Sequence, residues 1–151
     1  MNPSSPATPG RHLSLLPLLL LLAAGGLQAE TPMAISLTGG AEVPPVISPA
    51  SGSGRITVKT DRSISGSIKV AGMAPTMAHI HEGAVGMNGP PIITLNQGLD
   101  SIYAVPAGAR LSPAQYASFA AGKLYINVHS ARYPAGEIRA QLPARPMRLA
   151  Y

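Results

Sequence analysis

The sequence predicts an all-β domain with one short helix near residues 112–121, built as an antiparallel β-sandwich of Greek-key type or as a small barrel. Three observations support this class. Apolar and polar residues alternate in short runs from Met33 onward, residues rich in Gly, Pro and Ser separate these runs, and a single segment carries strong helix-start signals. Alternation with a period of two is typical of half-buried strands. Short strands at regular spacing then favour a sandwich or a barrel.

The alternation predicts strands at 33–37, 56–58, 64–70, 91–95, 124–129 and 137–142. The run 48–54 combines proline, glycine and serine, so we expect it to be a loop rather than part of a strand. Residues 133–136 have turn composition and should connect the last two strands.

The helix is predicted from its two ends. Ser112 is a good N-cap, Pro113 suits the first helical position, and Gln115 completes a capping box. Gly122 can close the C-terminus. Because these signals are independent and agree, we expect one helix here.

The first 29 residues have the features of an export signal. Arg11-His12 precedes the apolar run Leu13–Ala24, and Ala29 is a small residue at the expected cleavage site. We therefore expect a signal peptide at 1–29, a lead-in at 30–35, one domain at 36–142 and a basic tail at 143–151. The apolar run is short for a membrane span, so we expect an exported protein, periplasmic or secreted, with no span after cleavage.

Composition excludes several classes of function. The formal net charge is +5, aromatics are 4% of the residues, and the basic residues are scattered, which argues against nucleic-acid binding. The chain has no cysteine, hence no disulfide, thiolate ligand or cysteine nucleophile. With only six acidic residues, hydrolysis by paired carboxylates is also poorly supported. An envelope or extracellular protein remains a candidate partner.

Three histidines remain after the signal segment, and their spacing predicts a shared site. His79 and His81 lie two residues apart, so an extended strand presents both on one face. His129 shares the polar face of its own strand with Tyr125 and Asn127. If the two faces coincide, three imidazoles meet, a donor set that suits one copper or zinc ion. We then expect their nitrogens to converge to within about 4 Å of one another.

Four polar residues are candidates for orienting these imidazoles: Glu82, Tyr125, Asn127 and Glu137. Glu82 faces away from the histidines if its strand continues, and approaches them only if the chain turns at the next residue. Glu137 shares a strand face with Arg139, and the simpler interpretation is an ion pair between them at the surface or at an edge. Tyr125 is equally suited to covering the edge of the core.

Two methionines near the His79–His81 segment, Met77 and Met87, are candidate soft ligands. Thioethers favour cuprous copper. The alternative is that they fill irregular apolar space, as most methionines do.

Four ordered blocks of the sequence resemble the CHRD domain, a family named after chordin. The blocks are Gly40–Pro45, Ala78–His81 followed by Gly83, Gly86, Asn88, Gly89 and Pro90, then Gly122–His129, and Pro134–Leu142. The resemblance spans about Ser36 to Leu142 and implies a β-rich domain outside the cytoplasm. The His-x-His strand also looks like the copper-binding strand of copper-zinc superoxide dismutases. That enzyme uses more histidines, one of them bridging, so three histidines exclude a dinuclear site here.

These observations lead to two hypotheses of different kinds. The first is an exported CHRD-type module that binds a single transition-metal ion, copper before zinc, through His79, His81 and His129. It would serve metal handling or redox chemistry such as superoxide dismutation, and whether it is an enzyme is left open. The second is a structural or protein-interaction module whose histidines stabilise the fold without a metal.

Overall fold

The computed structural model describes Met1 and residues 30–145. The signal segment predicted at 1–29 and the end of the predicted tail therefore lie outside the described residues, apart from Met1. None of the helices within the described residues is long and apolar enough to cross a membrane.

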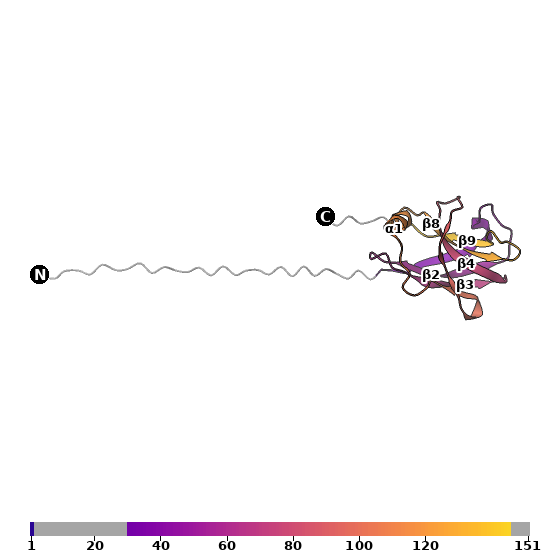
Figure 1. Cartoon of the computed structure of the whole chain (residues 1–151), viewed down its shortest axis with the longest axis horizontal. Coiled ribbons are helices and arrows are strands. Elements are labelled where there is room, and N and C mark those ends of the chain that lie inside the picture. The colour runs from indigo at the N-terminus through magenta and orange to yellow at the C-terminus, as the bar shows by residue number, and fades with distance from the viewer. Residues whose placement is uncertain (2–29, 146–151) are drawn as a thin grey trace.

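The described residues form one antiparallel sheet of nine strands (Figure 1). The strands are β1 Met33–Thr38, β2 Ser51–Val58, β3 Ile64–Ala71, β4 Pro75–Glu82, β5 Pro91–Thr94, β6 Asn96–Gln97, β7 Ile102–Ala104, β8 Leu124–Ser130 and β9 Ile138–Gln141. Their order in the sheet is β5-β4-β8-β9-β1-β2-β3-β7-β6. The two edge strands, β5 and β6, are separated in the chain by Leu95 alone, so the sheet curls until its edges nearly meet.

The predicted fold class is confirmed, and the sheet resembles a nearly closed barrel rather than two separate sheets. Inward-facing side chains of alternating residues form one core, and Leu37, Ile56, Ile80 and Ile126 are fully buried in it. This burial follows from the period-two alternation and supplies the main driving force for closing the sheet.

The one α-helix within the described residues, α1, spans Pro113–Ala120. The Ser112 side chain accepts a hydrogen bond from the backbone N–H of Gln115, and the Gln115 side chain accepts one from the N–H of Ser112. This is the predicted capping box. Gly122 follows the helix with φ +71°, the left-handed conformation that glycine adopts without strain. Two short 3-10 helices, η1 Gly39–Ala41 and η2 Leu99–Ser101, complete the elements.

One predicted boundary is wrong. The run 48–54 was expected to be a loop, but β2 begins at Ser51 and pairs with β1 on one side and β3 on the other. Its glycines permit close packing rather than a turn, because a Cβ on Gly54 would lie 2.0 Å from the carbonyl oxygen of Ser67. Strand β1 begins at Met33, where the alternation predicted the first strand.

Strand β8 is the centre of the polar part of the sheet. All seven of its residues are buried, although only alternate ones face the core. Connections between strands cover its other face: Arg139 of the neighbouring β9 donates hydrogen bonds to the backbone carbonyls of Ala84 and Met87 in the connection 83–90. The sheet therefore holds a layer of buried polar side chains between its outer face and these connections.

Candidate metal site

The three histidines lie on one face of two paired strands. His79 and His81 belong to β4 and His129 to β8, and the register pairs His79 with Asn127 and Met77 with His129. Strand parity then places all three imidazoles on the same side of the sheet. One ligand atom from each histidine lies within 4.8 Å of the others.

Two of the nitrogens are already slightly closer together than two ligands of one ion. The Nδ1 of His79 lies 3.0 Å from the Nε2 of His129, and nitrogens bound tetrahedrally at about 2.0–2.1 Å are about 3.3 Å apart. The largest separation, 4.8 Å, exceeds the expected value of about 4 Å. A small side-chain rotation must therefore accompany binding of an ion to all three.

Backbone carbonyls fix the tautomers of two imidazoles. His81 Nδ1 lies 2.8 Å from the carbonyl oxygen of Gly89, and His129 Nδ1 lies 2.9 Å from that of Pro134. A carbonyl only accepts, so both Nδ1 atoms carry the proton and both Nε2 atoms keep a lone pair. This is the arrangement that typically orients metal-binding histidines.

The Nε2 atoms of these two histidines have different surroundings. His129 Nε2 accepts the hydrogen bond from His79 Nδ1. His81 Nε2 is buried and has no hydrogen-bond partner among residues 30–145. A buried acceptor without a hydrogen bond destabilises the fold, and its lone pair is free to bind an ion.

Burial favours the neutral forms of His79 and His81. It is the largest cause that lowers the pKa of His79, and the neighbouring His129 and His81 lower it further. Burial also lowers the pKa of His81, against the opposing effect of its hydrogen bond to Gly89. Neutral imidazoles have the lone pairs that a transition metal requires.

Tyr125 holds His81 in place from the adjacent strand. The two rings stack at a centroid distance of 4.8 Å and an interplanar angle of 9°. The Tyr125 hydroxyl accepts a hydrogen bond from the N–H of Gly89 and also contacts its carbonyl oxygen, which is the acceptor for His81. The guanidinium of Arg139 lies 3.4 Å from the centroid of the same tyrosine ring. Tyr125 thus stacks on the imidazole of His81 and contacts the same backbone carbonyl.

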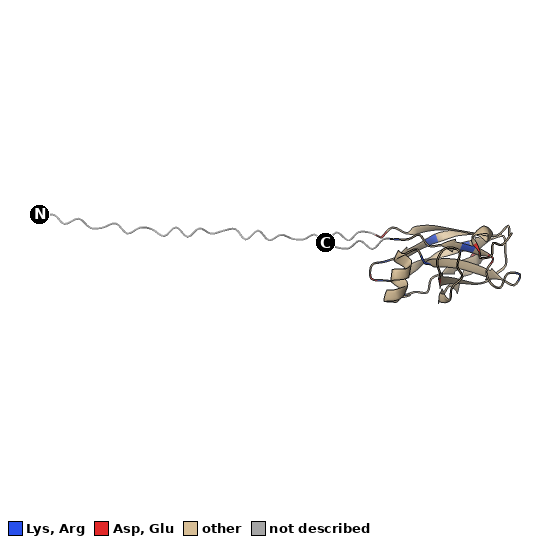
Figure 2. Ribbon diagram, turned by 90° about the horizontal axis from the view of Figure 1, so that it is seen from above, with Lys and Arg blue, Asp and Glu red and all other residues tan. Residues whose placement is uncertain are grey.

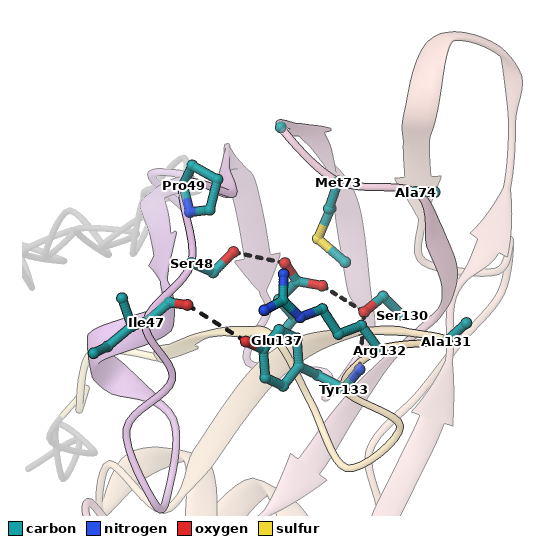
Figure 3. Close-up of a pocket in the computed structure, with 11 residues that line it drawn as sticks. Ile47, Ser48, Pro49, Met73, Ala74, Ser130, Ala131, Arg132, Tyr133 and Glu137 are labelled. Atoms are coloured by element: carbon teal, nitrogen blue, oxygen red, sulfur yellow. Dashed lines mark hydrogen bonds between the residues drawn. The ribbon is translucent and has the colours of Figure 1, made fainter.

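The expected ion pair between Glu137 and Arg139 is wrong. Both side chains are buried, and no salt bridge between them is found in the part of the chain that the structure describes. Glu137 accepts hydrogen bonds from the hydroxyls of Ser48 at 2.6 Å and Ser130 at 2.5 Å, beside a hollow of about 340 Å³ (Figure 3). Two hydroxyls hold this carboxylate, while Arg139 is held over Tyr125 by the connection 83–90.

Glu82 stabilises the helix rather than the histidines. It remains within β4, so its side chain points away from His79 and His81, and it accepts a hydrogen bond of 2.6 Å from Ser118 of α1. The chain turns at Gly83, too late to bring this carboxylate to the imidazoles.

The two candidate soft ligands are exposed. Met77 is 46% exposed and pairs in register with His129, two residues from His79 on the same strand. Met87 is 60% exposed and belongs to the connection 83–90. Neither fills the core, so the packing interpretation does not apply to them.

Sequence reasoning missed a buried carboxyl beside the site. Glu42 is 5% exposed, and burial raises its pKa to about 7 even though Arg139 and Asn127 act in the opposite direction. Its neighbours in the sequence are Ala41 and Val43, so the available signal was a single carboxylate within an apolar segment. The orienting carbonyls of Gly89 and Pro134 had no sequence signal, because every residue has a carbonyl.

Charged residues are few in this domain. Figure 2 shows charged residues scattered over the domain rather than gathered into a patch. One exposed salt bridge, Arg110 to Asp61 at 3.6 Å, is found within residues 30–145. Electrostatics near the histidines therefore depends on buried groups.

The fold and the site together define an antiparallel, barrel-like β-domain with a three-histidine cluster on the outer face of its sheet. The family model of the CHRD domain matches residues 33–142, and the chain belongs to this family. No curated protein and no solved structure matches the chain.

Proposed function

We propose that this CHRD domain binds one transition-metal ion, copper before zinc, through His79, His81 and His129, and that it serves metal handling outside the cytoplasm. One observation carries the proposal. Three imidazoles converge on one face of a sheet, and backbone carbonyls bind the Nδ1 atoms of two of them, so that their Nε2 atoms are the candidate ligand atoms.

His81 is the residue that distinguishes metal binding from a purely structural role of the histidines. A histidine that only stabilises a fold is expected to have its buried nitrogens hydrogen-bonded. The pair His79 and His129 meets that expectation. His81 Nε2 does not, and a buried unpaired polar atom costs about 1–3 kcal/mol. A bound ion would offset that cost.

The preference for copper rests on affinity and on neighbouring sulfur. Imidazole ligands suit both metals, and copper(II) binds a given donor set more tightly than zinc. Exposed thioethers at Met77 and Met87 would help deliver or receive copper(I). Export is part of the proposal and is supported by the apolar run Leu13–Ala24 followed by a small residue at Ala29.

Equilibrium titration of purified protein with copper and zinc tests the proposal. We expect one ion per chain and a loss of at least tenfold in affinity for His81→Ala and His129→Ala. Asp61→Ala is the matched control, because it removes an exposed potential ligand far from the cluster and should leave affinity unchanged. No stoichiometric binding, or unchanged binding in His81→Ala, would leave the structural-module hypothesis.

The redox form of the proposal has its own test. Copper-loaded protein would have to remove superoxide faster than an equal concentration of free copper. Turnover equal to that of free copper would restrict the function to metal handling.

A further inference from the structure

Asn127 occupies the centre of the buried polar layer. Its register partners are His79 on β4 and Arg139 on β9, and it lies on the same strand face as His129. Its side chain is 2% exposed. An amide in this position must find its partners among the groups of the layer itself.

The two ends of this amide have different surroundings. The Nδ2 donates a weak hydrogen bond of 3.5 Å to the carbonyl oxygen of Ala135. The same nitrogen would lie 2.6 Å from a Cβ placed on Gly136, so it packs closely against that backbone. The Oδ1 is buried and has no hydrogen-bond partner among the described residues.

A second unpartnered acceptor lies nearby, on the adjacent strand. The hydrogen bond to Gly89 leaves His81 Nε2 with a lone pair, and the Asn127 side chain lies close enough to accept a hydrogen bond from the protonated ring, which raises the pKa of His81. Two buried acceptors that share a site repel each other unless a proton donor or a cation lies between them. A cation bound by the neighbouring histidines satisfies both.

We propose that Asn127 Oδ1 is the fourth donor of the metal site, so that the bound ion has three nitrogen ligands and one amide oxygen, all from the protein. This inference rests on the proposed metal binding. It predicts a closed, four-coordinate site, typical of ions that are held rather than used in catalysis. Since carbonyl oxygen suits harder ions than thioether does, it also favours copper(II) and zinc(II) over copper(I).

The decisive variant is Asn127→Leu, which removes the oxygen while filling its space. We expect at least a tenfold loss of affinity for copper(II) and zinc(II) and less than a threefold change for copper(I). Tyr103→Phe is the matched control, because it removes another buried oxygen without a described partner, on β7, and should leave all three affinities unchanged. Asn127→Asp places an anionic oxygen at the same position and should tighten zinc(II) binding.

Water proton relaxation by the copper(II)-loaded protein tests whether the oxygen binds the ion directly. A closed site has no exchanging water, so the wild-type protein should relax bulk water weakly and Asn127→Leu more strongly. Strong relaxation by the wild-type protein, or equal affinity losses for copper(I) and copper(II), would overturn the assignment. If Asn127→Leu does not fold, unchanged or weaker zinc binding by Asn127→Asp would overturn it. Wild-type protein that binds no metal would refute the proposed function itself.

Discussion

Replacing Glu42 with glutamine tests whether the buried polar layer has the electrostatics that the structure assigns to it. Burial raises the pKa of this carboxyl from 4.5 to about 7 in the folded protein. Each pKa difference of one corresponds to about 1.4 kcal/mol, so the free energy of unfolding should change by up to roughly 3 kcal/mol. Water reaching the carboxyl would reduce this value.

The sign follows from proton binding. Between pH 4.5 and 7 the folded state keeps the proton of Glu42 more tightly than the unfolded state does. The contribution of this carboxyl is therefore most favourable below pH 4.5 and is lost as the pH rises to about 7. The lowered pKa values of His79 and His81 act in the opposite direction: below pH 6.5 their contribution to the free energy of unfolding increases as the pH rises.

Urea unfolding of metal-free protein at pH values from 4.5 to 8 measures the effect. The histidine contributions are common to the wild-type protein and Glu42→Gln, so the difference between their unfolding free energies isolates the carboxyl. We expect Glu42→Gln to become more stable relative to the wild type by about 2–3 kcal/mol as the pH rises over this range. A difference that does not vary with pH would refute the raised pKa.

Substitutions at three further positions test other parts of the account. Gly136→Ala should destabilise the domain by more than about 2 kcal/mol in thermal or urea unfolding, because φ is +138° and a Cβ would lie 2.5 Å from a carboxylate oxygen; full stability would contradict this packing. Ser112→Ala should cost about 1 kcal/mol through loss of the cap, whereas Ser112→Asp should retain it. Arg139→Met removes the cation over Tyr125 and the hydrogen bonds to the connection 83–90, so hydrogen exchange there should accelerate. Unchanged exchange in Arg139→Met would show that other contacts hold this connection.

The predictions were correct for features that depend only on residues close together in the sequence. The capping box at Ser112 depends on residues three positions apart, and the common face of His79 and His81 depends only on strand parity. The strand at Ser51 was missed because its glycine-serine composition serves close packing against strands that are distant in sequence. Composition alone does not distinguish such packing from a turn.

The candidate site was predictable only in part, because some of its contacts join segments that are distant in the sequence. His129 lies 50 residues from His79, and whether their strands pair is a property of the whole sheet. Glu137 and Arg139 were expected to pair at the surface or at an edge, yet both side chains are buried by other parts of the chain. Tautomers set by backbone carbonyls are likewise visible only after the connections are in place.

Anomalous diffraction from a crystal grown with copper tests the central claim most directly. The account predicts one copper peak per chain, about 2.0–2.1 Å from His79, His81 Nε2 and His129 Nε2. The 3.0 Å contact between His79 and His129 should lengthen to about 3.3 Å as the ion replaces their shared proton. A peak elsewhere, or an intact hydrogen bond between these two imidazoles in the presence of saturating copper, would contradict it.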